Sequence, residues 1–216
     1  MQDTKLRQDV IDELEFEPSI EAASIGVTAK DGVVTLSGHV TSYAEKIAAE
    51  RATRRVKGVR AIAQEIEVRY PGSARTADDE IATRALNALK WIAAVPHEDI
   101  KVTVNHGLVT LSGEVAWHYQ SDAAENAVRG LIGVTGVANS IALKPQARAV
   151  DVKKKIEDAL RRHAEVEAKS IRVNVINDKV TLEGTVDNWD ERMAVENAAW
   201  SAPGVRMVED RLRIGA

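Results

Sequence analysis

Three stretches of the chain share one pattern of apolar and polar residues. In each, an alternating run leads into two turn-forming residues, and a second run then reads Val-Thr-Leu-x-Gly-x-Val. The glycines of the second run are Gly38, Gly113 and Gly184, so the stretches recur at spacings of 75 and 71 residues. Recurrence at this period indicates three copies of one structural unit.

Each stretch predicts a β-hairpin. Apolar residues fall on every second position, which is the period of a strand with one buried face. The pairs between the runs tolerate the positive φ angles of a tight turn. They are Asp31-Gly32, His106-Gly107 and Asn177-Asp178. The repeated glycine lies on the apolar face of the second run, and from this we infer that a helix crosses closely over it. A turn or bulge is the alternative.

Helical periodicity flanks each hairpin. In the first unit it predicts a helix from about Thr4 to Phe16 and an alanine-rich helix from Tyr43 to about Val56. A third alternating run from Ile62 to Val68 completes the unit. The residues expected to face inward on the alanine-rich helix are Ile47, Ala48, Ala52 and Val56.

The second and third units repeat this order. The second opens with a helix whose expected cap is Thr76 or Asp78, and its alanine-rich helix is expected from about Tyr119 to Leu131. The inward residues expected on its first helix are Ile81, Ala85, Leu86 and Leu89. In the third unit they are Val152, Ile156 and Leu160 on the first helix, and Ala194, Ala198 and Ala199 on the second.

The pattern therefore predicts an α+β protein built from three tandem α-β-β-α-β units. Each unit is expected to form a three-stranded mixed sheet with two helices packed on one face. The expected domains are residues 1–70, 76–144 and 148–216, with turn-forming linkers between them. A unit of this size has a small core, so contacts between neighbouring units are expected to add stability.

The composition of the chain excludes several kinds of functional site and argues against one kind of partner. The chain of 216 residues has no cysteine, which excludes disulfides and thiolate sites, and no apolar run approaches the roughly 20 residues that cross a bilayer. The net charge is −4. Basic and acidic residues number 10 and 12 in residues 1–70, 6 and 8 in 71–146, and 13 and 13 in 147–216. Nucleic acid is therefore not expected as a partner, because no unit is basic.

The N-terminus gives an expectation about location. Residues Met1 to Lys5 lead directly into a polar amphipathic segment, without the apolar region of a signal peptide. We therefore expect a soluble, cytoplasmic chain with no transmembrane segment. A periplasmic mature form, trimmed of its signal, would show the same pattern.

The combined motifs resemble the BON domain, in three tandem copies that cover nearly the whole chain. The resemblance is carried by the Val-Thr-Leu-x-Gly-x-Val runs, the alanine-rich helices, the Gly58-Val59 and Gly133-Val134 helix stops and the final short strands. It implies a non-catalytic bacterial module, often associated with the envelope and with stress, that binds phospholipids or other hydrophobic partners. Periplasmic members of the family carry a secretion signal, and this sequence shows none.

Aromatic residues gather where the second run of each unit meets the alanine-rich helix. They are Tyr43, Trp117, Tyr119 and Trp189. Tryptophan and tyrosine suit a lipid headgroup boundary, because an apolar ring ends in a polar group. The alternative, which we favour from the sequence, is that they pack the strand-helix corner of a small core. Phe16, Trp91 and Arg162 share one position on the first helices, which indicates that Trp91 lies at the surface or at a contact between units.

Basic residues form two groups on predicted helices. Arg51, Arg54 and Arg55 share one helical face, and Lys153, Lys154, Lys155, Arg161 and Arg162 form the second group. Each could add about 1 kcal/mol near an anionic membrane. Acidic residues neighbour both groups, so the favoured interpretation is a solvated, ion-paired helix surface.

No arrangement of residues predicts catalysis. The five histidines lack the paired spacing of a metal site, and no cofactor is expected. Gln64, Asn139 and Asp210 occupy equivalent, inward-facing positions on the third strands of the three units. Each is expected to hydrogen-bond to backbone in a structural role. Gly-x-x-G strings at residues 130–136 match the RNA-binding KH loop only superficially, because they lead from a helix to a strand.

The leading hypothesis is a non-enzymatic, three-unit binding protein. It would meet an anionic phospholipid surface, or another hydrophobic partner, peripherally, with avidity from three weak sites. The residues proposed to bind are the four corner aromatics together with Arg51, Arg54 and Arg55. The alternative is a soluble intracellular adaptor whose units bind proteins or one another. The oligomeric state does not follow from the sequence.

Overall fold

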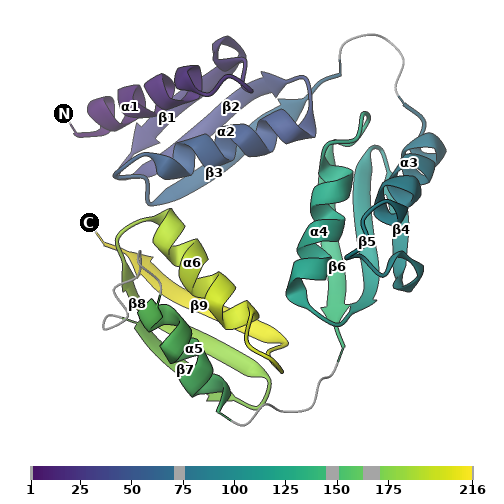
Figure 1. Ribbon diagram of the computed structural model, residues 1–216. Coiled ribbons are helices and arrows are strands. Elements are labelled where there is room, and N and C mark those ends of the chain that lie inside the picture. The colour runs from purple at the N-terminus through teal and green to yellow at the C-terminus, as the bar shows by residue number, and fades with distance from the viewer. Residues whose placement is uncertain (1, 71–75, 145–150, 163–170, 216) are drawn as a thin grey trace. The chain divides into compact units, whose positions relative to one another are not determined.

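The computed structural model describes residues 2–70, 76–144, 151–162 and 171–215, which form three modules with the same order of elements (Figure 1). We call residues 2–70 module 1, residues 76–144 module 2 and residues 151–215 module 3. Each module runs helix, strand, strand, helix, strand, as the sequence predicts. The expected domain limits at 1–70, 76–144 and 148–216 remain predictions, because the linker residues lie outside the described part of the chain.

The bounds of the elements are similar in the three modules. Module 1 contains α1 (Gln2–Phe16), a 3-10 turn η1 (Ala22–Ser24), β1 (Ile25–Lys30), β2 (Val33–Val40), α2 (Tyr43–Arg55) and β3 (Ala61–Val68). Module 2 contains α3 (Asp78–Lys90), η2 (His97–Asp99), β4 (Ile100–Asn105), β5 (Leu108–Val115), α4 (His118–Arg129) and β6 (Gly136–Leu143). Module 3 contains α5 (Val152–Arg162), β7 (Ile171–Ile176), β8 (Lys179–Val186), α6 (Trp189–Trp200) and β9 (Met207–Ile214).

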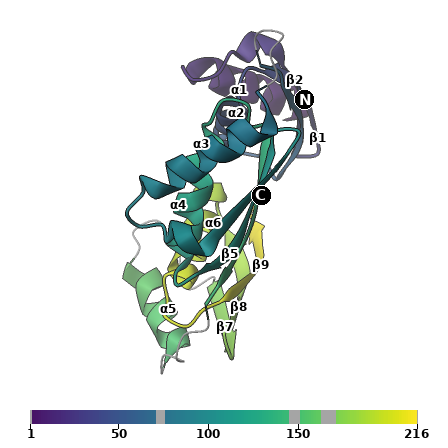
Figure 2. The ribbon, with the colours of Figure 1, turned by 90° about the vertical axis from the view of Figure 1, so that its right-hand side faces the viewer.

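Each module has one mixed sheet covered on one face by its two helices. In module 1 the strand order is β1-β2-β3, with β1 antiparallel and β3 parallel to β2, and module 3 repeats this register. Figure 2 shows the layers in module 3, where α5 and α6 lie on one side of β7, β8 and β9. The predicted α+β fold of three tandem units is therefore confirmed.

The core of each module lies between its helices and its sheet. In module 1, Val10 and Leu14 of α1 pack with Val34 and Leu36 of β2, and all four are almost fully buried. Module 3 forms an equivalent cluster around Ile156, Leu160, Val180 and Leu182. Within each module both helices lie on the same face of the sheet, so the other face carries no helix of that module.

The hairpin turns form as predicted. Asp31, His106 and Asn177 have φ angles of 51°, 51° and 59°, in the left-handed region that such short polar residues tolerate. In module 1, the first turn of α1 supports the hairpin, because Asp3 accepts a hydrogen bond from the Asp31 amide at 3.0 Å. In module 2, Asp78 accepts from the amides of His106 and Gly107 at 2.8 and 3.0 Å.

The inference that a helix crosses over the repeated glycine is wrong. A Cβ at Gly38 would lie 2.2 Å from the carbonyl oxygen of Ser24, and one at Gly113 would lie 2.0 Å from that of Asp99. The backbone that approaches is therefore the 3-10 turn that leads into the neighbouring strand. Gly38, Gly113 and Gly184 have positive φ angles of 109°, 133° and 138°, and each pairs with the first isoleucine of that strand. Their surroundings are alike where described.

Details of the helices also differ from expectation. On α2 the buried positions are Glu45, Ala49, Ala52 and Thr53, so the helix is rotated relative to the predicted stripe, and Ala48 is only half-buried. Ser121, Ala124 and Val128 are buried on α4. On α3, Leu86 is exposed, and the N-cap is Ala77, which has no side chain to cap with, in place of Thr76 or Asp78. The orientation of an alanine-rich helix about its axis is hard to predict from the sequence, because small side chains define no wide apolar stripe.

Candidate functional site

The candidate surface is the corner where the end of the first helix meets the start of the second helix, which we call the helix corner. In module 1 it is built around the Glu45 carboxylate, which accepts hydrogen bonds from the amides of Glu21 and Thr41, both at 2.9 Å. The Ser42 hydroxyl caps α2 by accepting from the Glu45 amide at 3.1 Å. Glu45 is buried by these contacts and joins the α1–β1 connection to the β2–α2 connection.

Beside Glu45, module 1 has a shallow hollow of about 670 Å³. Its walls come from the α1–β1 connection and the first turn of α2, including Pro18, Ile20 and Ala44. The buried carboxylate at its edge, that of Glu45, is already bound by backbone amides.

In module 2 the helix corner is aromatic and exposed. The Gln120 side chain donates to the Ala94 carbonyl at 3.1 Å and joins the loop after α3 to the first turn of α4. Trp91, at the end of α3, is 88% exposed, and Tyr119, in the first turn of α4, is 58% exposed. The hydrogen bond therefore holds together two segments that each present an aromatic ring to solvent.

The equivalent corners of the other modules carry other chemistry. In module 1, Phe16 takes the place of Trp91 and is also exposed, while Ala44 takes the place of Tyr119. In module 3 these two positions are Arg162 and Asp190. The fold therefore accepts aromatic, small or charged residues at these two positions. Packing alone does not require the aromatic pair of module 2.

The predicted corner aromatics differ in exposure. Tyr43, Trp117 and Trp189 are half-buried, whereas Tyr119 is exposed. The Trp189 ring lies 5.2 Å from the Arg192 guanidinium, in a cation–π contact that occupies part of its surface. These residues come from three modules, and two of them, Trp117 and Tyr119, belong to module 2. Sequence reasoning left Trp91 out of the binding set, although its alignment with Phe16 and Arg162 pointed to a surface position.

The three predicted arginines lie toward the C-terminal end of α2, away from Tyr43 at its first residue. Arg55 bridges to α1 through Glu13 at 2.9 Å and Glu17 at 3.2 Å, and Arg54 pairs with Glu50. Hydrogen bonds from Ser19 and Arg55 lower the pKa of Glu17. Arg51 is exposed, with no ion pair among the residues that are described. Two of the three arginines are thus engaged within module 1.

The first helix of module 3 is the most basic of the first helices. Between Val152 and Arg162, α5 holds five basic and two acidic residues, and all five basic residues are exposed. The equivalent α1 holds two basic and five acidic residues, and α3 holds two and three. Since the three helices have the same place in the fold, packing does not require the basic character of α5.

The third strand of each module carries one polar residue that faces inward, and in module 2 this residue contacts both backbone and the second helix. Asn139 accepts from the Ile141 amide at 3.2 Å, and its side-chain amide donates to Ser121 Oγ at 2.8 Å and to Glu125 Oε2 at 3.1 Å. Gln64 accepts from the Ile66 amide at 3.4 Å, while its buried Nε2 has no partner among the described residues. The backbone contact was predicted, whereas the helix contacts were not.

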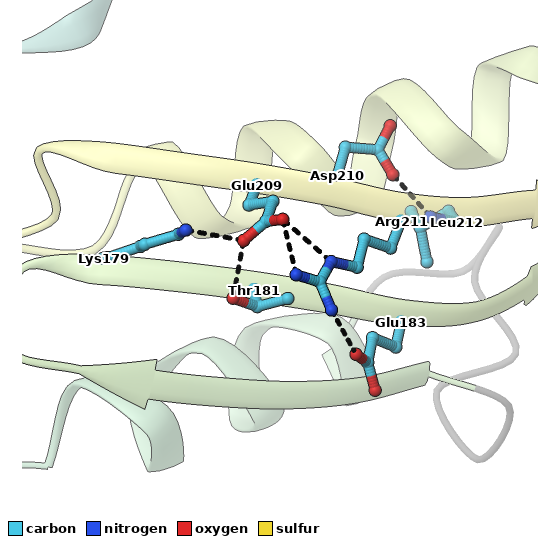
Figure 3. Close-up of polar contacts among 7 residues, drawn as sticks. All are labelled: Lys179, Thr181, Glu183, Glu209, Asp210, Arg211 and Leu212. Atoms are coloured by element: carbon cyan, nitrogen blue, oxygen red, sulfur yellow. Dashed lines mark hydrogen bonds and ion pairs between the residues drawn. The ribbon is translucent and has the colours of Figure 1, made fainter.

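The open sheet face of module 3 carries a ladder of charges. Glu209 lies between Lys179 at 2.6 Å and Arg211 at 2.7 Å, and Arg211 also reaches Glu183 at 3.4 Å (Figure 3). Hydrogen bonds from Lys179 and Arg211 lower the pKa of Glu209 to about 2. Within this ladder the two carboxylates balance the two cations, in contrast to the excess of basic residues on α5.

Two further observations bear on the class of site. Within residues 2–70, 76–144, 151–162 and 171–215, no group of three or more His, Asp or Glu side chains is placed to hold a metal ion. In the same part of the chain, no helix is long and apolar enough to cross a membrane.

Three tandem α-β-β-α-β modules with a variable surface corner define a class of proteins built from repeated small domains. Comparison with known families identifies the class: the BON domain model matches residues 2–70, 77–145 and 149–216. The chain belongs to the BON-domain family, as its motifs indicated.

A curated relative and two solved structures are also similar to the chain. The osmotically-inducible protein Y of Escherichia coli (strain K12) is 32% identical over 148 residues, which cover 67% of this chain and 74% of that protein. The C-terminal domain of CdsD, a structural protein of the type III secretion system of Chlamydia trachomatis, is 15% identical with a TM-score of 0.28, and 98% of each chain is covered. The PrgH periplasmic domain is 11% identical with a TM-score of 0.23, covering 95% of this chain and 100% of that one.

Proposed function

We propose that this protein is a non-enzymatic BON-domain protein that binds an anionic phospholipid surface peripherally, in a role linked to osmotic stress. The link to osmotic stress is supported by the similarity to the osmotically-inducible protein Y. A role in binding is supported by the buried Glu45 carboxylate, which is engaged in structural hydrogen bonds.

The observation that carries the proposal is the exposed aromatic pair at the helix corner of module 2. Trp91 is 88% exposed, so nearly all of its side-chain surface is available to a partner. Tyr119 adds a second ring from the adjoining segment, and Lys90 precedes Trp91 with an exposed ammonium group. Rings with polar ends beside a cation suit the boundary between lipid headgroups and acyl chains.

The basic face of α5 supplies the electrostatic part of the proposal. Lys154, Lys155 and Arg162 are exposed, and an anionic membrane attracts each nearby cation by about 1 kcal/mol. Such attraction acts over roughly 10 Å at ordinary salt and weakens as salt is added. Arg51 of module 1 is a further candidate, while Arg54 and Arg55 would first have to leave their acidic partners.

Co-sedimentation of the full chain with vesicles tests the proposal. At low salt, vesicles containing phosphatidylglycerol are expected to bind the chain more strongly than neutral phosphatidylcholine vesicles. The double substitution Trp91→Ala with Tyr119→Ala should weaken binding about tenfold or more, because insertion of one large ring contributes roughly 1.5–3 kcal/mol. The matched control is Phe16→Ala, which removes an equally exposed ring from the same position in module 1, where the neighbouring residues are acidic.

Absence of binding by the intact chain at low salt would rule out the lipid surface. The half-burial of Tyr43, Trp117 and Trp189 favours a second candidate, an adaptor whose modules bind protein partners. If vesicles fail to bind while Trp91→Ala abolishes association with a purified partner protein, the adaptor replaces the lipid proposal. The compartment in which the protein acts stays a prediction.

A further inference from the structure

Strand β4 forms one edge of the sheet of module 2, because the strand order is β4-β5-β6 (Figure 1). A strand at an edge has backbone N–H and C=O groups that point away from the sheet. Asn105 and Leu108 flank the two-residue turn and form a hydrogen-bonded pair, as the residues that close such a turn do. Facing pairs alternate along an antiparallel ladder, so Ile100, Val102 and Val104 direct their backbone groups outward.

In module 1 a side chain of α1 covers the equivalent edge. Arg7 Nε donates a hydrogen bond to the Val27 carbonyl at 3.0 Å. The repeat spacing of 75 residues aligns Arg7 with Ala82 and Val27 with Val102. Alanine has no donor, so the Val102 carbonyl lacks the side-chain partner that the Val27 carbonyl has. A charged side chain at an edge hinders the pairing of another strand, and β4 lacks this protection.

The edge formed by the third strand is occupied in every module. The amides of Ile66, Ile141 and Leu212 donate to the side chains of Gln64, Asn139 and Asp210 at 3.4, 3.2 and 2.7 Å. An amide that donates within its own strand is not available to an added strand. In module 2, β4 is therefore the edge that can accept one.

Two apolar side chains beside β4 remain in contact with water. Leu86 is 43% exposed, whereas its equivalent in module 1, Ile11, packs against the core. Leu86 follows Ala82 by one helical turn and lies on the same side of α3. Val102 is half-buried, whereas the equivalent valines of modules 1 and 3 are buried. An additional strand beside β4 would extend the sheet under this side of α3 and cover both residues.

We propose that two copies of the chain form a dimer in which β4 pairs antiparallel with β4 of the second copy. An added strand must be apolar toward α3 and must not bring a cation opposite Lys101, and β4 meets both conditions. Around a two-fold axis at Val102, the two Val102 residues exchange both backbone hydrogen bonds. Each Val104 amide then donates to the Ile100 carbonyl of the other copy, and Lys101 faces the uncharged Thr103.

The residue beside the edge distinguishes module 2 from the other modules. Ala82 has the place beside Val102 that Arg7 has beside Val27, so it lies near the proposed axis. At a two-fold interface, a residue near the axis meets its own copy. Two alanines allow close approach. Arg7, or Lys153 at the aligned position of module 3, would instead meet an equal charge.

Sedimentation equilibrium of the full chain tests the dimer. At roughly 200 µM, a dissociation constant of tens of micromolar would give mostly dimer. Ala82→Arg introduces the residue of module 1, so the fold should be kept, and the dissociation constant should rise about tenfold or more. The matched control is Asn87→Arg, which adds the same charge at an exposed position about 140° around α3 and should leave the constant unchanged.

A monomer at roughly 200 µM would overturn the second copy as the occupant and would leave this edge to an extended segment of another protein. A dimer that Ala82→Arg does not weaken would overturn its placement at β4. Amide hydrogen exchange gives an independent readout. The Val102 and Val104 amides should exchange faster when the chain is diluted to monomer, whereas the Val27 amide of module 1 should not change. Exchange at Val102 and Val104 that is independent of concentration contradicts the pairing.

Single cysteines test the position of the axis, because the chain has no cysteine of its own. Facing residues of a hydrogen-bonded pair have Cα atoms about 5.5 Å apart, within the range that a disulfide spans. Val102→Cys should therefore give a disulfide-linked dimer under mild oxidation. Val27→Cys is the matched control at the equivalent position of module 1 and should stay monomeric. Equal cross-linking of the two variants would refute the proposed axis.

Discussion

The substitution Gly113→Ala tests the packing on which every module depends. Gly113 has a φ angle of 133°, which an alanine adopts only at a cost of about 1–3 kcal/mol. The new Cβ would lie 2.0 Å from the Asp99 carbonyl oxygen, whereas real Cβ atoms keep at least 3.0 Å. The start of β4 would therefore have to retreat by at least about 1 Å, at a further cost of about 1–3 kcal/mol.

Together these terms predict a loss of about 2–6 kcal/mol from module 2. A module of this size has a total free energy of unfolding of roughly 4–10 kcal/mol, so the variant should lose a large share of it. The alternative idea, a helix lying over this glycine, would instead place the damage in α4. The expected damage lies at η2 and the first residues of β4.

Urea unfolding of the full chain, followed by amide NMR signals assigned to each module, measures the effect. For about 70 residues the urea dependence is about 1 kcal/mol per M, so the midpoint of module 2 should fall by about 2 M or more. Signals of modules 1 and 3 should unfold as before, apart from any contribution of contacts between modules. The matched control is Gly130→Ala, where a Cβ would meet nothing within 4 Å, and its midpoint should stay within about 0.5 M. If Gly113→Ala were equally neutral, the close approach of the Asp99 carbonyl would be refuted.

Two further predictions concern single side chains. Asp78→Ala removes the carboxylate that accepts hydrogen bonds from the His106 and Gly107 amides, and it should lower the free energy of unfolding of module 2 by about 1–2 kcal/mol, measured in urea. The control Asp79→Ala, at the adjacent residue, should lower it by less than about 0.5 kcal/mol. Equal effects would contradict the role of Asp78 in the hairpin. Because hydrogen bonds from Lys179 and Arg211 lower the pKa of Glu209 from 4.5 to about 2, the stability contributed by its ionised form is present above pH 4.5 and lost as the pH falls toward 2. A carboxyl NMR titration should show this pKa rising toward 4.5 in Lys179→Met, and an unchanged value would refute the contribution of that ion pair.

Short-range features of the fold followed well from the sequence. The turns at Asp31, His106 and Asn177 form where residues tolerant of positive φ interrupt two alternating runs. Helix and strand order also followed, because periods of two and of about 3.6 residues are local properties of the chain. The family resemblance, carried by the same local motifs, was confirmed.

Side-chain contacts between distant elements did not follow. The bridge from Arg55 to Glu13 joins α2 to α1, and no local pattern marks which of three neighbouring arginines will form it. The role of Glu45 was missed for the same reason, since its partners Glu21 and Thr41 belong to two separate connections. From the sequence alone a charged residue is expected at the surface, because the hydrogen-bond partners that allow its burial are not known.

The sequence by itself determined the repeat, the class of fold and the backbone angles of the hairpin turns, since each depends on neighbours a few residues apart. Only the tertiary structure decided which backbone approaches Gly38 and Gly113, how α2 is rotated, and which aromatic rings remain in solvent. Those outcomes depend on contacts across the module, where the same alanine, arginine or tryptophan can be buried, paired or exposed according to what lies opposite.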